Sequence, residues 1–347
     1  MSPENQLAKT PLSIQTRRGI IRNLWPATAL ECTISHYYDW EPYFDYYEDQ
    51  CHHALHERGK HIILRTHQHV IDITSKLVQG QSRATVKSNL KSLFSSEGTL
   101  PNEDEILSNS VDLAARLGFM VNIGKNAFTA TRCQKLLWDS SSLKDFVHTY
   151  FNEPQVLSYS NVRLEKTFTA INMERVADMK ICWTSNLADH LRMLNDDDKV
   201  VAIFHHASFL ECQKDSPIFP PGLIAETIRT LALIFPKHDK QTKRMLQVVC
   251  PSQSVDRRLQ RLHKLRLDDR QIETFKFWRD RLIILKQAFD DSRPAKLSQW
   301  WYDRRDGHVW YTFWVAVLVL LLTVFFGLIQ SIEGALQVYK AYNPTNR

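Results

Sequence analysis

The sequence predicts a mainly α-helical body with a small β-sheet, an α+β fold, followed by one transmembrane helix near the C-terminus. Three observations lead to this prediction. Apolar residues recur at helical spacing over 71–151, and a two-residue alternation begins after Pro154. Residues 309–332 contain no charged side chain. With 347 residues, the chain can form one large domain or two smaller ones besides the span.

The chain begins with a polar stretch, residues 1–20, for which we expect a disordered tail. Residues 21–154 then form an aromatic- and histidine-rich segment followed by a helical region. Residues 37–47 include seven aromatics interleaved with acids. Such a segment serves as a docking face in some proteins, but more often it buries its rings in its own core. Six His lie between 52 and 69, without the spacing of a zinc site, so no metal ion or other cofactor is predicted.

Three helices are expected in this region. Their apolar stripes include Val86 with Leu90, Ile106 with Val111, and a third set over 143–150. Asn102 and the acids after it indicate where the second of these helices starts.

Residues 155–236 read as a small α+β region. We predict short strands over 168–172, 179–183 and 200–204, where apolar residues alternate. A short helix is expected over 186–194. A longer one is expected over 223–235, between the Pro220-Pro221-Gly222 turn and Pro236.

Residues 237–306 are predicted to form a basic juxtamembrane segment and an amphipathic helical stalk. Residues 237–270 carry ten Lys and Arg against four Asp, which equals the net charge of +6 for the whole chain. This stretch is either a solvated face or a contact for anionic lipid. We expect no nucleic-acid partner, because a membrane span follows soon afterwards. The apolar seam over 275–289 favours packing against the body rather than a coiled coil.

The transmembrane helix is predicted over 309–332. Fifteen of these 24 residues are Val, Leu, Ile or Phe, which favours insertion into a lipid bilayer by about 5–9 kcal/mol. Arg293, Lys296, Arg304 and Arg305 precede the span, whereas only Lys340 and Arg347 follow it. The positive-inside rule therefore predicts a cytoplasmic body. The six scattered Cys agree with a reducing compartment. With a short C-terminal tail over 333–347, this layout predicts a tail-anchored protein, inserted in the endoplasmic reticulum.

Few residues suggest catalysis. The chain has ten Gly and neither a phosphate-binding loop nor a nucleophile elbow. The best catalytic candidates follow the predicted strand 200–204, where His206 would act as the base for Ser208 or Cys212. The alternative is that these residues only start a helix and pack it.

Several stretches resemble a large set of uncharacterised membrane proteins of filamentous fungi. The similar segments are SQWWYDRR (298–305), WYTFWVAV (310–317), IQSIEGALQVY (329–339), ICWTSNLADHL (181–191) and ETIRTLAL (226–233). The resemblance implies a C-terminal membrane helix and brings no catalytic or binding residues with it. Such expanded fungal sets often occupy variable genome regions, including those for secondary metabolism.

These observations favour a membrane-anchored interaction or accessory protein with an unknown protein partner, one specific form being an accessory to fungal secondary metabolism. An enzyme centred on His206, Ser208 and Cys212 is the second hypothesis. The third is an oligomeric membrane-active protein, since Gly327 and Gly334 allow a homo-oligomer through the span.

Overall fold

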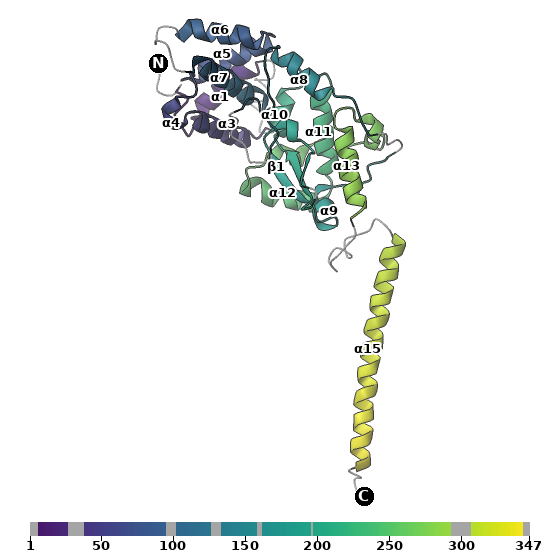
Figure 1. Ribbon diagram of the computed structural model, residues 1–347. Coiled ribbons are helices and arrows are strands. Elements are labelled where there is room, and N and C mark those ends of the chain that lie inside the picture. The colour runs from purple at the N-terminus through teal and green to yellow at the C-terminus, as the bar shows by residue number, and fades with distance from the viewer. Residues whose placement is uncertain are drawn as a thin grey trace. The chain divides into compact units, whose positions relative to one another are not determined.

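The computed structural model describes residues 6–26, 38–94, 102–125, 133–157, 162–195, 197–292 and 307–342. The chain divides into two compact units, Met1–Asp291 and Ser292–Arg347, which we call the body and the anchor unit and describe separately. The body begins with helices coloured purple to blue in Figure 1: α1 (Ile14–Leu24), α3 (Glu41–Ala54), α4 (His56–Gly59), α5 (His67–Val78), α6 (Arg83–Phe94) and α7 (Glu103–Phe119).

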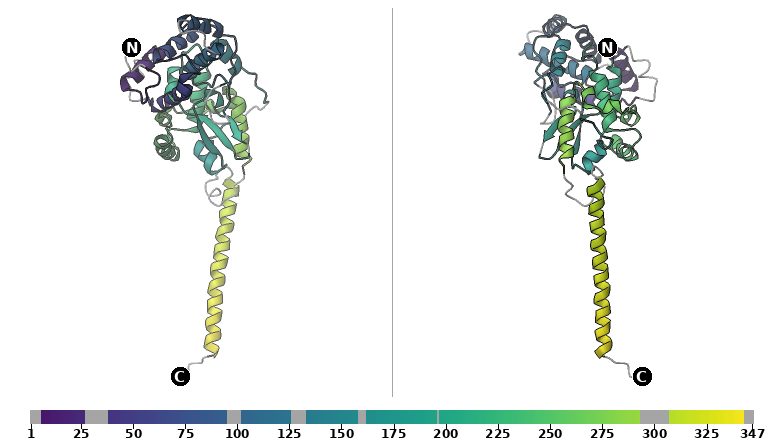
Figure 2. Two further views of the ribbon diagram at one scale, coloured as in Figure 1. Left: turned by 60° about the vertical axis from the view of Figure 1, so that its left-hand side comes forward. Right: turned by 90° about the vertical axis from the view of Figure 1, so that its right-hand side faces the viewer.

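The rest of the body combines a small sheet with further helices, as the two views in Figure 2 show. The elements before and within the sheet are α8 (Leu143–Phe151), α9 (Ala170–Arg175), β1 (Lys180–Thr184), the 3-10 helix η3 (Leu187–Asp189), β2 (Met193–Asn195) and β3 (Val200–Phe204). The elements after it are α10 (Ala207–Cys212), α11 (Leu223–Ile234), α12 (Lys240–Ser252), η4 (Arg257–Arg261), η5 (Asp268–Arg270), η6 (Ile272–Thr274) and α13 (Arg279–Asp290). The predicted fold class, mainly α with a small sheet, is confirmed.

β3 is the central strand of the sheet, whose strand order is β1–β3–β2. It pairs in parallel with β1, from Lys180 opposite Val200 to Thr184 opposite Phe204, and antiparallel with β2. Protein covers β3 on both faces, because its last four residues are each at most 1% exposed. Since β1 and β3 run in the same direction, their carboxyl ends meet at one edge of the sheet.

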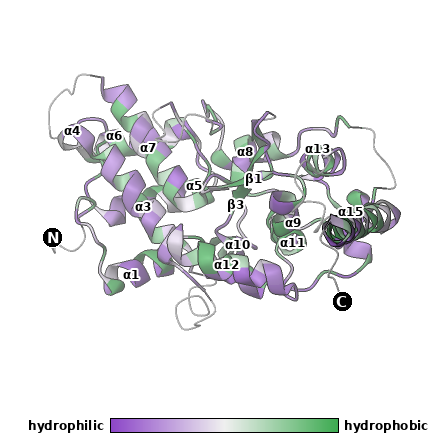
Figure 3. Ribbon diagram, turned by 90° about the horizontal axis from the view of Figure 1, so that it is seen from below, coloured by the Kyte–Doolittle hydropathy of each residue, from purple (hydrophilic) through white to green (hydrophobic). Residues whose placement is uncertain are grey.

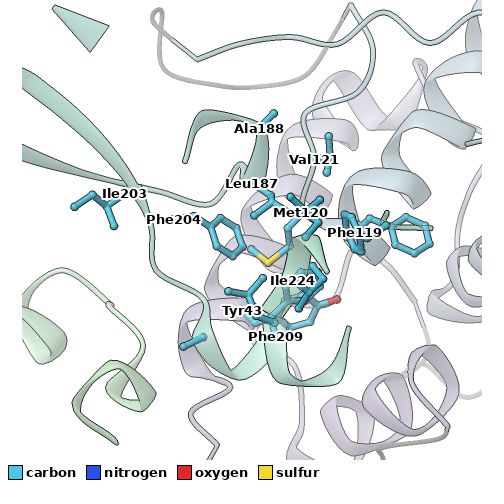
Figure 4. Packing of buried hydrophobic residues seen from close by; sticks show 14 of the residues in the cluster. Tyr43, Phe119, Met120, Val121, Leu187, Ala188, Ile203, Phe204, Phe209 and Ile224 are labelled. Carbon is cyan, nitrogen blue, oxygen red and sulfur yellow. The ribbon is translucent and has the colours of Figure 1, made fainter. Parts of the chain in front are cut away.

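One hydrophobic core joins the early helices to the sheet. Figure 4 shows part of it, where Tyr43 of α3, Phe204 of β3, Phe209 of α10 and Ile224 of α11 gather around the end of α7. The rings of Tyr43 and Phe209 are stacked, with their centroids 6.1 Å apart. Burying a side chain of this kind contributes about 1.5–3 kcal/mol, so these contacts hold the two parts of the body together.

Residues 6–20 belong to the folded body, which corrects the prediction of a disordered tail over 1–20. Leu7 is only 1% exposed, and its N–H donates to the carbonyl of Arg65 at 2.9 Å. Helix α1 starts at Ser13, whose hydroxyl accepts the N–H of Thr16 at 3.1 Å, and it buries Ile20. The polar composition concealed these few, widely spaced core residues. Residues 1–5 lie outside the described residues.

The strands predicted over 179–183 and 200–204 are present as β1 and β3, whereas the strand predicted over 168–172 is absent. Residues 168–172 run into helix α9 instead, because Thr169 caps that helix by accepting the N–H of Asn172. The helix predicted over 186–194 is also wrong. The chain there forms η3 and then β2, and Leu191, with φ of 59°, donates its N–H to the carbonyl of Ala202 at 2.8 Å.

The helices predicted around residues 86–94, 106–117, 143–150 and 223–235 are confirmed as α6, α7, α8 and α11. Asn102 precedes α7 as expected, but with a left-handed backbone and no side-chain capping bond. Hydrophilic and hydrophobic residues alternate along α3 and α7 in Figure 3, as expected for helices that bury one side.

Residues 237–291 are part of the body rather than a separate stalk. The apolar seam of α13 packs into the core, as predicted, with Leu282 and Leu285 fully buried. Glu226 of α11 holds the start of this helix, since its carboxylate accepts the N–H groups of Phe277 and Trp278, each at 2.8 Å. Residues 293–306, the remainder of the predicted stalk, lie outside the described residues.

The described part of the anchor unit contains one helix, α15 (Gly307–Tyr342), drawn in yellow in Figure 1. Its 33 residues Trp310–Tyr342 include a window with a mean hydropathy of 2.7, none of which is buried. This helix is long and apolar enough to cross a membrane. The predicted span, 309–332, lies within it, and the helix continues through 333–342, which we expected to form a tail. At 1.5 Å per residue α15 is about 54 Å long, against about 30 Å for the hydrocarbon core of a bilayer.

Candidate binding cleft

A polar cleft with a volume of about 360 Å³ opens where β1 and β3 end, and this volume lies in the range of small-ligand pockets. Its walls come from the strand ends, from α3 and from three further segments. The strand ends contribute Trp183, Thr184, Ser185, Asn186 and His205. Helix α3 contributes Pro42, Asp45, Tyr46, Asp49 and Gln50, and the other segments contribute Asn122, Cys133, Gln253 and Ser254.

The acidic side of the cleft follows from the amphipathic pattern of α3. Tyr43 and Tyr47 face the core and are each 1% exposed, which turns Asp45 and Asp49 outward to the cleft. Asp45 accepts a hydrogen bond from Ser254. Asp49 makes no hydrogen bond or ion pair within the described part of the chain. None of the fourteen described wall residues is Lys or Arg, so the cleft is acidic.

Hydrogen bonds fix the uncharged polar side chains of the cleft. Asn186 accepts the N–H of Asn122 at 3.0 Å and donates to Asp189 at 2.8 Å. Gln50 accepts from the guanidinium of Arg116 at 3.0 Å. Because these side chains are held from behind, this part of the cleft wall has a fixed shape.

His205 is one of the buried polar residues that line this cleft, with 6% of its surface exposed. Its ring lies 3.9 Å from that of His206 and meets Trp183 edge to face at 6.0 Å. Its Nδ1 has no hydrogen-bond partner among the described residues. Burial lowers the pKa of the imidazole to about 3, so this ring is neutral at pH 7.

The chemistry of the cleft favours binding over nucleophilic catalysis. Burial, and then the charge of Asp189, raises the pKa of the Cys133 thiol to about 11, which leaves very little thiolate at pH 7. A general base works best with a pKa near the ambient pH, and that of His205 is far below it. The two groups therefore lack the ionisation that a catalytic pair needs.

His206, the predicted base, is directed to a different partner from the one expected. Its Nε2 lies 2.8 Å from the hydroxyl of Ser185, and the residue is 1% exposed. Burial, and then the neighbouring His205, holds the pKa of His206 well below its usual range. It is His205, and not His206, that lines the cleft.

Ser208, the predicted nucleophile, is occupied by a structural contact. Its hydroxyl donates to Asp256 at 3.0 Å and accepts the N–H of Asp39 at 2.8 Å. Asp256 also accepts the N–H of Arg258 at 2.8 Å. Burial raises the pKa of Asp256 to about 7. Cys212, the other predicted nucleophile, is buried on α10. These residues pack and cap, the alternative that the sequence left open.

The aromatic segment packs on the body's own core, as predicted: Tyr43, Phe44 and Tyr47 are buried, and its other described rings are half-buried against the core. Trp25 stacks on Trp40 with centroids 5.3 Å apart and meets Tyr43 edge to face, and Tyr43 donates to the carbonyl of Leu117 at 2.8 Å. Tyr37, the first ring of the segment, lies outside the described residues. These contacts bring the acidic face of α3 to the end of the sheet.

The histidine-rich segment is spread over three helices and the turn between α4 and α5, which contains His61. His52 and His53 lie on α3, His56 on α4, and His67 and His69 on α5. Among the described residues, no three His, Cys, Asp or Glu side chains gather around a position that a metal ion would occupy.

Sequence reasoning missed the cleft, because its walls are distributed from residue 42 to residue 254. Two local signals pointed toward it. His205 directly follows a predicted strand, and Asp45 and Asp49 are one helical turn apart on a segment rich in aromatic residues. No protein-family model matches this chain, and neither a curated protein nor a solved structure is similar enough to match it.

Proposed function

We propose that the chain is a membrane-anchored interaction protein, whose helix α15 spans the bilayer and whose body binds a partner on the cytoplasmic side. The observation that carries this proposal is the 33-residue apolar stretch Trp310–Tyr342, whose most hydrophobic window has none of its surface buried by protein. An apolar surface of this size in water is unfavourable at about 25 cal/mol per Å². A bilayer removes that cost.

The orientation follows from charge. Four Lys and Arg between residues 293 and 305 precede the span, and two follow it, which favours a cytoplasmic body. We extend the proposal to insertion after translation into the endoplasmic reticulum. One specific form of this proposal is an accessory to fungal secondary metabolism, because expanded fungal sets like the one this chain resembles often occupy such genome regions.

A C-terminal glycosylation tag tests both insertion and orientation. The native sequence offers no usable Asn-x-Ser/Thr acceptor, because its one candidate, Asn343-Pro-Thr345, is blocked by proline. We expect an acceptor tag appended after Arg347 to be glycosylated when completed chains are added to microsomes, and the same tag at the N-terminus to remain unmodified. Extraction of the untagged chain from membranes at alkaline pH, or glycosylation of the N-terminal tag instead, would contradict the proposal.

A binding role rather than an enzymatic one is supported by the separate contacts of His206 and Ser208. Each of the two is engaged by another side chain, Ser185 and Asp256 respectively. If the chain were an enzyme acting through this pair, His206→Gln would abolish turnover of any substrate. Under the proposal it changes only stability.

Anionic lipid is the second proposed partner, supported by the exposure of the basic segment 237–270. Eight of its ten Lys and Arg are exposed, while Arg258 lies 3.4 Å from Glu211 and Arg270 donates to the Glu165 carbonyl. Surface Lys or Arg near anionic lipid contribute about 1 kcal/mol each.

Hydrogen exchange in nanodiscs tests this contact. Anionic lipid is expected to slow exchange over α12 in the full chain, and replacing Lys240, Lys243 and Arg244 by Gln is expected to remove the effect. Replacing the exposed Lys9 and Lys60 serves as the control and leaves the protection unchanged. Equal exchange of α12 in neutral and anionic discs would exclude the lipid contact.

A further inference from the structure

We propose that the cleft at the carboxyl ends of β1 and β3 binds an organic cation, an alkylammonium or guanidinium group. This ligand would bind to the body alone. Cation binding by the cleft and membrane anchoring through α15 can therefore be tested separately.

The cleft carries two carboxylates and no Lys or Arg side chain among its described wall residues. Asp45 and Asp49 lie four residues apart on the same side of α3 and both line the cleft. Two carboxylates in this relation repel each other. The guanidinium of Arg116, behind the wall, is already engaged by Gln50 and by the carbonyl of Ile123. A cation bound in the cleft would relieve the repulsion.

The cleft also contains a buried imidazole, that of His205, whose ring makes no hydrogen bond with the described residues. His205 is more than nine-tenths buried and lines the cleft. Because burial keeps the pKa of this ring low, it carries no charge that would repel a cation at pH 7. A neutral imidazole also has one nitrogen that accepts a hydrogen bond from an N–H donor.

Two aromatic rings form part of the cleft wall. Trp183 and Tyr46 both line the cleft. Trp183 is held in place by stacking on Phe235, with centroids 5.6 Å apart, and the hydroxyl of Tyr46 donates to the carbonyl of Arg116 at 3.3 Å. Electron-rich rings beside carboxylates are the surroundings in which proteins bind ammonium and guanidinium groups.

The volume of about 360 Å³ suits a small amine or a single long side chain. The cation therefore comes either from a free metabolite or from a Lys or Arg of a protein partner. The two sources share one chemistry and differ in what surrounds it. A free amine needs only the cleft, whereas a peptide also contacts the surface around it.

Titration calorimetry and ligand-observed NMR on the full chain in detergent micelles test the site. The probes are agmatine, short capped peptides with a central Lys or Arg, and n-butanol as a neutral control. We expect saturable binding of the cationic probes that weakens with added salt, and none of butanol. Tighter binding of the peptides than of agmatine would identify a protein side chain as the source, and the reverse would identify a free amine.

Asp49→Asn is the decisive variant, because Asp49 makes no hydrogen bond or ion pair with the described residues and its loss leaves the fold intact. We expect its affinity for agmatine to fall about tenfold or more, the effect of losing one charge-assisted hydrogen bond. Asp139→Asn makes the same charge change at an exposed residue outside the cleft and is expected to bind as the native chain does. Unchanged affinity in Asp49→Asn, or equal binding of butanol, would overturn the proposal.

Discussion

Glu226 offers a quantitative test of the finding that α13 belongs to the body. Its carboxylate accepts the backbone N–H groups of Lys276, Phe277 and Trp278, each at 2.8 Å, just before the helix begins. Glu226→Ala removes all three acceptors. The Trp278 N–H is buried and the other two are partly buried, so water replaces the lost acceptor only in part.

The expected loss of stability follows from these three donors. A buried N–H without an acceptor costs about 2–3 kcal/mol and a partly hydrated one about 0.5–1 kcal/mol. The sum is about 3–5 kcal/mol, a large share of the roughly 5–15 kcal/mol that stabilises a typical domain.

Chemical unfolding of the full chain in detergent, followed by tryptophan fluorescence, measures this loss, and hydrogen exchange locates it. We expect faster exchange of the amides over 279–290 in Glu226→Ala. Asp139→Ala removes an exposed carboxylate elsewhere and serves as the matched control. A loss below about 0.5 kcal/mol, typical of surface positions, together with unchanged exchange in α13, would refute the reasoning.

Two further predictions concern the pH dependence and the backbone of the body. Burial lowers the pKa of His67 to about 4, so the folded state binds fewer protons than the unfolded state between about pH 6.5 and 4, and stability falls with falling pH. Relative to the native chain, His67→Gln is expected to reduce that slope by about 1.4 kcal/mol per pH unit, measured by urea unfolding at several pH values. Gly124→Ala is expected to cost at least about 1–3 kcal/mol, because Gly124 has a φ of 99° and an added Cβ would collide with the carboxylate of Asp112; an unchanged melting temperature would contradict this.

Local sequence signals were sufficient where a helix has strong boundaries. Helix α11 runs from Leu223 to Ile234, between Gly222, whose φ of 92° suits glycine, and Pro236, which cannot continue a helix. The apolar spacing of α7 and α8 also matches the face that each buries. In these elements local propensity and tertiary packing favour the same structure.

The sequence-based predictions are wrong where contacts between residues far apart in the chain determine the local structure. β2 exists because β3 lies beside it, and the bond from the Leu191 N–H to the Ala202 carbonyl links residues eleven apart that no local pattern joins. The tail assigned to residues 1–20 folds because Leu7 reaches Arg65. The prediction that His206 pairs with Ser208 is wrong for the same reason, because Ser208 donates to Asp256, 48 residues away, instead of contacting its neighbour His206.

The hydrophobic core of the described part of the body ends at Phe289, and α15 belongs to the other compact unit. The core of the body and the helix that we propose to span the membrane therefore occupy different stretches of the chain. Under the proposed anchoring, exchanging α15 for an apolar helix of another length is expected to direct the same body to a bilayer of another thickness. Mutations in α15 are then expected to change the membrane in which the body resides and to leave the ligand proposed for the cleft unchanged.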